Sequence, residues 1–211
     1  MPEKADLLLV GFMFGAAEAR LDTMFRVHRI EDFAQAHDLP AETAGKFRVV
    51  SVGMVGTGHT STVAVNGAFL DCFPRLELLA ALGVGVDYID VEAAAARGVT
   101  VTNTPGANTE ETADTAMGLL LSTVRQLPQA DRFIRSGKWP SAMFPLTGTL
   151  RDKRLGILGL GNIGRAVARR AAPFGLEILY HNRNRRTDVA YTYVDSVLEL
   201  ARAVDILMVI V

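Results

Sequence analysis

The chain has very little cysteine and no excess of charge. Among its 211 residues Cys72 is the single cysteine, which excludes an intramolecular disulfide and a cysteine-based metal cluster. The 22 basic and 23 acidic residues give a formal net charge of -1, so the composition shows no electrostatic footprint for nucleic acid. A protein with one thiol and no disulfide is typical of the reducing cytoplasm, where we expect this one to reside.

The chain also lacks a long apolar run. The segment from Leu7 to Ala17 is apolar or small in character, but it is far shorter than the ~20 residues that a membrane-spanning helix needs. The charged residues before it are Glu3, Lys4 and Asp6, which do not form the positive start of a signal peptide. We therefore interpret Leu7 to Val10 as a buried strand and expect no membrane partner.

Short apolar segments alternate with segments of helical periodicity, a pattern typical of parallel sheets covered by helices on both faces. The predicted strands of the first half are Leu7 to Val10, Phe25 to Ile30, Phe47 to Val52, Leu78 to Ala81 and Val99 to Thr102. Helices are predicted at Thr62 to Phe73, Val91 to Arg97, Ala107 to Val124 and Gln129 to Ser136. A turn cluster around Pro105 predicts two α/β domains, at 1–105 and 106–211, with a hinge between them.

Three glycines follow the apolar run Leu155 to Leu158 in the order G-x-G-x-x-G. They are Gly159, Gly161 and Gly164, and the residues from Arg165 to Phe174 have helical character. In such a fingerprint the first glycine permits a tight turn, the second lets the backbone approach a pyrophosphate, and the third allows close helix packing. Because a second strand is predicted at Glu177 to Tyr180, this context favours a dinucleotide site over a purely structural glycine turn.

The segment after that second strand bears on which dinucleotide is bound. An acidic residue there usually binds the ribose hydroxyls of NAD, whereas an arginine accommodates the 2′-phosphate of NADP. This chain has Asn182, Arg183, Asn184, Arg185 and Arg186 in that place, and its next carboxylate is Asp188. Guanidinium groups form bidentate pairs with phosphate, so NADP is favoured and NAD stays possible. A solvated basic turn is the alternative interpretation.

Three longer strings extend the pattern: LGVGVDYIDVEAAAARGVTVTNTPG at 82–106, TEETADTAMGLLL at 109–121 and LGILGLGNIGRAVARRAAPFG at 155–175. In their order and spacing they resemble the D-isomer-specific 2-hydroxyacid dehydrogenase family, in particular its glyoxylate and hydroxypyruvate reductases. The resemblance implies a flavodoxin-like substrate domain followed by a Rossmann NAD(P)-binding domain. It also implies hydride transfer between NADP(H) and a small 2-oxo acid, a D-2-hydroxy acid as the reduced product, and a homodimer.

The resemblance also implies roles for individual residues. Val84 and Gly85 match the turn whose backbone N–H groups bind the substrate carboxylate, although a simple strand-to-helix turn would have the same letters. Met54 and Val55 match a loop beside the substrate, or a plain loop. The remaining matches are Thr112 near the nicotinamide ribose, Asp114 as a carboxylate of the same helix, Asn162 and Ile163 at the pyrophosphate, and Asn182, Arg183 and Asn184 as the NADP-selecting loop.

The catalytic Arg, Glu and His of the family match no residue of this sequence. The resemblance places them beyond Val211, and these 211 residues alone are expected to show no turnover of glyoxylate or hydroxypyruvate. The histidines present, His28, His37, His59 and His181, are interpreted as surface residues without metal-ligand spacing. Two alternatives stay open: a dinucleotide-sensing, co-repressor-like binding protein, and phosphoglycerate dehydrogenase, which would have an acidic residue near position 182.

Overall fold

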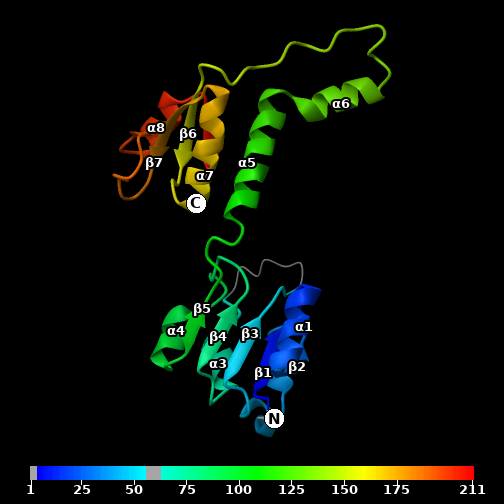
Figure 1. Ribbon diagram of the computed structural model, residues 1–211, viewed down its shortest axis with the longest axis vertical. Helices are drawn as coiled ribbons and strands as arrows, with labels where there is room; N and C mark the ends of the chain where they lie inside the picture. Colours follow the sequence, from blue (N-terminus) through cyan, green and yellow to red (C-terminus); the bar gives the residue numbers. More distant parts are fainter. Residues whose placement is uncertain (1–3, 56–62) are drawn as a thin grey trace. The chain divides into compact units, whose positions relative to one another are not determined.

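The computed structural model describes residues 4–55 and 63–211. It divides into two compact units, Met1–Ala107 and Asn108–Val211. Each unit is an α/β structure built on its own parallel sheet (Figure 1). Among the described residues, no helix is long and apolar enough to cross a membrane.

The first unit contains a five-stranded sheet with the strand order β2-β1-β3-β4-β5. Its strands are β1 (Asp6–Val10), β2 (Arg26–Ile30), β3 (Val49–Val52), β4 (Leu78–Ala81) and β5 (Thr100–Thr102), all paired in parallel. Between them lie α1 (Gly15–Met24), the 3-10 helix η1 (Ala34–Asp38), α2 (Ala41–Ala44), α3 (Gly67–Asp71) and α4 (Val91–Ala96). This order is that of flavodoxin-like doubly wound sheets, so the predicted fold class of the first half is confirmed.

The core of the first unit explains why β1 is a continuous apolar run. Leu7, Leu8, Leu9 and Val10 are each at most 2% exposed, because a central parallel strand is covered on both faces. The rings of Phe47, Phe69 and Phe73 add an aromatic cluster to the same core, with the Phe69 and Phe73 centroids 5.2 Å apart. Because β1, β3 and β4 pair in parallel, the loops that follow them emerge at the same edge of the sheet.

One predicted helix of this unit is wrong in extent. The segment Thr62 to Phe73 was expected to be helical throughout, whereas α3 covers only Gly67–Asp71, and Thr62 lies outside the described residues. The helix begins late because the Asn66 side chain caps it, accepting a hydrogen bond from the Phe69 N–H at 3.1 Å. Val65, just before the cap, is fully buried in a backbone bridge to Ile89, which holds it in extended conformation.

The second unit contains a four-stranded parallel sheet with the order β8-β7-β6-β9. Its elements are α5 (Thr109–Val124), α6 (Leu127–Arg135), β6 (Arg154–Leu158), α7 (Asn162–Ala171), the 3-10 helix η2 (Ala172–Phe174), β7 (Glu177–His181), β8 (Thr192–Tyr193), α8 (Val197–Ala203) and β9 (Ile206–Val209). The strands after β6 lie first on one side of it and then on the other. This is the strand order of a Rossmann half, and it confirms the predicted class of the second half.

The two faces of this sheet are covered by different helices, and Figure 1 shows β6 between α7 and α8. Leu155 and Ile157 are fully buried in the core that α5 and α7 share. Gly156 faces the other way, where a Cβ atom would lie only 3.0 Å from Val204 and 3.2 Å from Leu200. The absence of a side chain at Gly156 therefore lets α8 approach the sheet closely.

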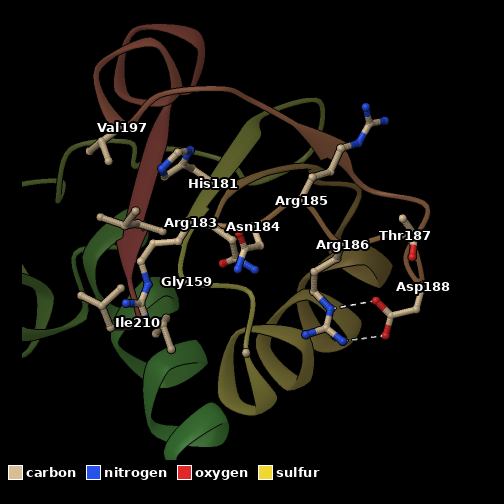
Figure 2. Close-up of a pocket in the computed structure, with 14 residues that line it drawn as sticks. Gly159, His181, Arg183, Asn184, Arg185, Arg186, Thr187, Asp188, Val197 and Ile210 are labelled. Carbon is tan, nitrogen blue, oxygen red and sulfur yellow. Dashed lines mark hydrogen bonds and ion pairs between the residues drawn. The ribbon is translucent and has the colours of Figure 1, made fainter.

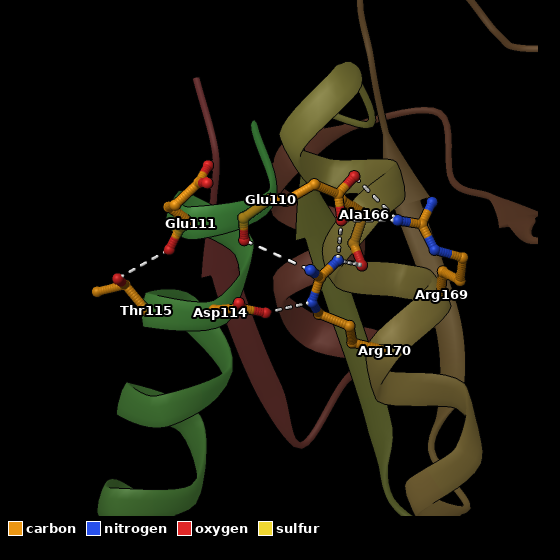
Figure 3. A network of polar contacts seen from close by, with 7 residues as sticks. All are labelled: Glu110, Glu111, Asp114, Thr115, Ala166, Arg169 and Arg170. Atoms are coloured by element: carbon orange, nitrogen blue, oxygen red, sulfur yellow. Dashed lines mark hydrogen bonds and ion pairs between the residues drawn. The ribbon is translucent and has the colours of Figure 1, made fainter. Parts of the chain in front are cut away.

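An ion-pair network joins α5 to α7 (Figure 3). Arg170 of α7 donates to Asp114 at 2.6 Å and pairs with Glu110 at 2.7 Å, while Arg169 pairs with the same Glu110 at 2.9 Å. The two guanidinium groups, that of Arg170 first, lower the pKa of the Glu110 carboxyl below its ordinary value. Asp114, which the resemblance matches to a family carboxylate, thus forms an ion pair with Arg170 of the neighbouring helix.

Candidate dinucleotide site

The three glycines after β6 differ in their surroundings. Gly159 adopts a φ of 98°, in the left-handed region, and a Cβ there would overlap the carbonyl oxygen of Ile210. A Cβ on Gly164 would overlap the carbonyl oxygen of Gly159, because α7 starts directly against the turn. Gly161 has no heavy atom within 4 Å of the position of a Cβ, so the space beside it is open to a ligand.

The N-terminus of α7 opens beside this turn. Gly161 is its N-cap residue and offers no side-chain cap. Among the described residues, the backbone N–H groups of Asn162 and Ile163 have no acceptor. A helix N-terminus with free N–H groups carries a partial positive charge and binds phosphate groups. The turn and the helix therefore fit the pyrophosphate of a dinucleotide.

A pocket of about 970 Å³ lies at the carboxyl ends of β6 and β7 (Figure 2). Its lining includes five residues that the sequence predicts to bind the cofactor: Gly159, Gly161, Asn182, Arg183 and Asn184. His181, Arg185, Arg186, Thr187 and Asp188 complete the wall formed by the loop after β7. Two segments far apart in the sequence, the glycine turn and this loop, thus form one pocket.

Asn182 braces the glycine turn. Its Oδ1 accepts a hydrogen bond from the backbone N–H of Leu160 at 2.6 Å, which ties the end of β7 to the turn after β6. An asparagine makes this contact without adding negative charge to the pocket. The sequence predicts a ligand-binding role for Asn182, and the structure shows that its side-chain oxygen is already used within the protein.

The arginines of the loop differ in their contacts. Among the described residues, Arg183 has no hydrogen-bond or ion-pair partner, and Figure 2 shows its side chain extending toward Ile210. Arg185 lies over the ring of Tyr193, 5.8 Å from its centroid. Arg186 makes a bidentate pair with Asp188, at 2.8 and 2.7 Å. Of these three guanidinium groups, that of Arg183 is the one held by neither an ion pair nor a ring.

Asp188 is paired twice. Besides Arg186 it contacts Arg165 Nη1 of α7 at 3.2 Å. The bidentate bond from Arg186 is the main reason why the pKa of Asp188 is lowered from 3.8 to about 2, and the charge of Arg165 acts in the same direction. From the sequence, Arg186 is one of the arginines that favour NADP, whereas Asp188 and Arg165 have no predicted role. The spacing Arg186-x-Asp188 was visible in the sequence, but the contact to Arg165 needs the folded chain.

Four other residues predicted to bind the cofactor, Thr112, Asn162, Ile163 and Gly164, do not belong to the described lining of the pocket. Thr112 is half-buried in the first turns of α5. Ile163 packs partly into the core of the second unit, and Asn162 is exposed. His181, by contrast, lines the pocket; it is half-buried, with its Nδ1 atom 2.8 Å from the Val194 carbonyl oxygen and its ring stacked on Tyr193.

In the first unit, the turn after β4 presents free backbone N–H groups. Gly83 adopts a φ of 126° and donates its N–H to Thr104 Oγ1 at 3.0 Å, while Asn103 Nδ2 donates to the Val84 carbonyl at 2.8 Å. Among the described residues, the N–H groups of Val84 and Gly85 have no acceptor, and both residues are exposed. Asn103 and Thr104, which hold this turn, were not identified from the sequence.

Met54 and Val55 follow β3, the neighbour of β4 in the sheet. Met54 is 46% exposed. Its backbone forms an antiparallel bridge with Phe12, which lies just after the end of β1 at Val10. Val55 packs partly against the core. The carboxyl ends of β1, β3 and β4 therefore bring Met54 and the Val84 turn to the same edge of the sheet, where doubly wound proteins bind ligands. His59 lies outside the described residues.

Comparisons with known proteins agree with this arrangement. Residues 117–211 match the model of the family described as D-isomer specific 2-hydroxyacid dehydrogenase, NAD binding domain. Hydroxyphenylpyruvate reductase of Plectranthus scutellarioides is 37% identical over 207 residues, which cover 98% of this chain and 64% of that protein.

Two crystal structures are similar in sequence and in fold. The NADPH-dependent glyoxylate/hydroxypyruvate reductase of Sinorhizobium meliloti, in complex with NADP and malonate, is 41% identical with a TM-score of 0.84; the match covers 99% of this chain and 63% of that one. A dehydrogenase of Rhizobium meliloti is 33% identical with a TM-score of 0.77, over 96% of this chain and 69% of that one. The chain thus spans somewhat less than two thirds of each of the two reductases.

Proposed function

The chain belongs to the D-isomer-specific 2-hydroxyacid dehydrogenase family, and from this premise we propose that it is part of an NADP(H)-dependent oxidoreductase. The enzyme interconverts a small 2-oxo acid and the corresponding D-2-hydroxy acid, in the manner of glyoxylate and hydroxypyruvate reductases. In this proposal the unit Asn108–Val211 binds the cofactor and the unit Met1–Ala107 binds the substrate.

The observation that carries the proposal is the Arg183 guanidinium, which shares a pocket with Gly161 and has no ion-pair partner among the described residues. A 2′-phosphate would satisfy this charge with strong, charge-assisted hydrogen bonds. Asn182, rather than a carboxylate, stands at the end of β7, so no negative side chain at that position would repel the phosphate. NADPH is therefore preferred to NADH, and the bound nicotinamide supplies the hydride.

The cofactor contacts follow from the same pocket. The N–H groups of Asn162 and Ile163 bind the pyrophosphate, with Gly159, Gly161 and Gly164 shaping the turn, while Arg183 and Asn184 hold the phosphorylated ribose. Thr112 is assigned to the nicotinamide ribose on the family resemblance.

The substrate carboxylate is assigned to the turn at Val84 and Gly85. Two adjacent free N–H groups in a glycine-rich turn form a concave site for an anion. The exposed Met54 side chain and the neighbouring Val55 would contact the rest of the acid. In support, the similar reductase of Sinorhizobium meliloti was crystallised with malonate, which is also a small carboxylic acid.

We extend the proposal to assembly and location. A homodimer is supported by the exposed apolar side chains of the segment from α5 onward, where Leu119, Ile134 and Trp139 are 65%, 57% and 62% exposed. The substrate is a small molecule, and neither nucleic acid nor a membrane is proposed as a partner. A cytoplasmic location is proposed because Cys72 is the only thiol.

The proposal is tested by titrating NADPH and NADH into the wild-type protein and into Arg183→Gln. We expect the wild-type protein to prefer NADPH, and the variant to lose about 10- to 100-fold of its NADPH affinity with little change for NADH, as the loss of a charged hydrogen-bond donor implies. Arg202→Gln removes an exposed arginine of α8 outside the pocket and serves as the control.

Turnover of glyoxylate and hydroxypyruvate with NADPH, measured on the full-length protein, tests the reaction itself. Equal affinity of the wild-type protein for NADPH and NADH, or an equal loss of both in Arg183→Gln, would contradict the cofactor assignment. Absence of turnover with every small 2-oxo acid tried, in a protein that binds NADPH, would contradict the reaction.

A further inference from the structure

We infer that Asp188 is a specificity-determining residue of this pocket, because it competes with the cofactor's 2′-phosphate for the guanidinium groups of Arg186 and Arg165. The inference rests on the proposed NADP site and adds to it a residue that weakens phosphate binding. Among the residues that the structure describes, Arg183 has no partner to give up, whereas Asp188 occupies the Nε and Nη2 fork of Arg186 and the Nη1 atom of Arg165, which a phosphate would need for the same contacts.

The contacts of Asp188 are those that a phosphate would make. Its two oxygens accept hydrogen bonds from Arg186 Nε and Nη2 at 2.8 and 2.7 Å, in the fork geometry by which arginine also binds phosphate. The oxygen nearer Arg165 lies 3.2 Å from its Nη1 atom. One carboxylate therefore pairs with two arginines from different elements, the loop after β7 and the first turn of α7, and leaves a net positive charge on the three groups.

The position of Asp188 lets it act on the ligand pocket. Asp188 and Arg186 both line the pocket of about 970 Å³ that contains Gly161 and Arg183. Asp188 also lines a second hollow of about 510 Å³, together with Arg165 and Asn162 of α7. Figure 2 shows the Asp188 carboxylate facing the Arg186 guanidinium in the wall of the proposed cofactor pocket, and Arg165 contacts the same carboxylate from α7.

The ion pairs are weak enough to be exchanged. The side chains of Asp188, Arg186 and Arg165 are 49%, 33% and 41% exposed, and ion pairs in contact with water contribute little to stability. A 2′-phosphate carries more charge than a carboxylate and offers three acceptor oxygens, so it can displace Asp188 from a guanidinium group. The displacement still costs the energy of the pairs it breaks, and this cost applies only to ligands that carry the phosphate.

The test uses two ligands that differ only in this group, 2′,5′-ADP and 5′-AMP, titrated calorimetrically into the protein. Asp188→Asn keeps the shape of the side chain and removes its charge. We expect the variant to bind 2′,5′-ADP about three- to five-fold more tightly than the wild-type protein and 5′-AMP equally well, as the strength of two exposed ion pairs implies.

Two further variants make the result specific. Asp195→Asn removes an exposed carboxylate of the same unit that does not line the pocket, and it should leave both affinities unchanged. Asp188→Ser, a second neutral variant, should reproduce the gain in 2′,5′-ADP affinity and serves if Asp188→Asn folds poorly. Unchanged or weaker 2′,5′-ADP binding in folded Asp188 variants would overturn the inference, as would an equal gain in Asp195→Asn.

The same titrations separate this inference from the proposed function. The wild-type preference for 2′,5′-ADP over 5′-AMP tests the NADP assignment, and the change caused by Asp188→Asn tests the role of Asp188. A wild-type protein that prefers 5′-AMP, together with a variant that gains 2′,5′-ADP binding, would contradict the NADP preference and support the competition by Asp188.

Discussion

Gly161 and Gly164 lie three positions apart in one turn, yet their α-carbons have opposite surroundings. Gly161 has a φ of -81°, which any residue can adopt, and open space where a Cβ would be. Gly164 is buried against the carbonyl oxygen of Gly159. The first glycine thus leaves room for a ligand, and the second leaves room for the protein itself.

These surroundings predict different results for two alanine variants. Gly164→Ala should lower the free energy of unfolding by about 1–3 kcal/mol, because the added methyl group forces α7 away from the turn. Gly161→Ala should leave stability nearly unchanged and weaken NADPH and NADH alike, since a methyl group would occupy the space proposed for the pyrophosphate. Denaturant unfolding and cofactor titration of both variants measure this. Equal stability of Gly164→Ala and the wild-type protein would be inconsistent with the observed packing.

Asn182 shows how the structure changes the interpretation of a single residue. From the sequence it is the residue that replaces a ribose-binding acid. In the structure its side-chain oxygen is bonded to the Leu160 N–H, so it also fixes the shape of the glycine turn. No sequence pattern indicates this bond, because it joins the segments that follow β6 and β7, which come together only when the two strands pair in the sheet.

Among the elements, α8 begins at a capping motif that the sequence contains, although the sequence-based prediction did not include this helix. Ser196 caps this helix by accepting a hydrogen bond from the Glu199 N–H at 3.2 Å. Serine followed three residues later by glutamate is typical of a helix start. The helix has only seven residues, and its apolar stripe is short, so periodicity alone did not indicate it.

The ion pairs between α5 and α7 should make the stability of the protein depend on pH. Arg170, and then Arg169, hold the pKa of Glu110 below its ordinary value of 4.5. A lowered carboxyl pKa stabilises the fold above the ordinary value, and this contribution is lost as the pH falls through the folded-state pKa. We expect Glu110→Gln to lower the melting temperature slightly at neutral pH, and the difference from the wild-type protein to shrink below about pH 4.5.

The control for this prediction is Glu111→Gln. Glu111 lies in the same first turn of α5 and has the same relation to the helix dipole, and Figure 3 shows its side chain away from Arg170. Melting curves of both variants between neutral and acidic pH make the comparison. A Glu111→Gln variant that behaves like Glu110→Gln would mean that the helix dipole, rather than the ion pairs, carries the effect.

At the scale of the whole molecule, two separate cores predict independent responses to mutation and ligand. Leu79 is fully buried in the first unit and Leu155 in the second. Each alanine substitution should cost its own unit about 2–5 kcal/mol. NADPH should raise the melting temperature of the second unit by mass action, and Leu79→Ala should leave this rise intact.

Scanning calorimetry of Leu79→Ala and Leu155→Ala, each with and without NADPH, checks this expectation. The two variants are matched controls for one another, since each creates a similar cavity in a different sheet. A single transition that both substitutions lower equally, and that NADPH raises equally, would show that the units unfold as one cooperative body.

The sequence by itself determined the two parallel α/β sheets and the strand, glycine turn and helix of the candidate site. Apolar alternation, helical periodicity and glycine spacing act within a few residues, so these features can be recognised locally. Helix starts such as that of α3 were less predictable, because the cap at Asn66 and the buried Val65 override periodicity.

Only the tertiary structure decided what each charged residue of the NADP-type loop does. The sequence shows a run of arginines, and the fold separates Arg183, which has no ion-pair partner among the described residues, from Arg186, which is bound to Asp188. The reason is physical: Arg165 and Asp188 are 23 positions apart, and they meet because the fold brings the loop after β7 to the first turn of α7. Ion pairing depends on distance in space, which a one-dimensional pattern does not record.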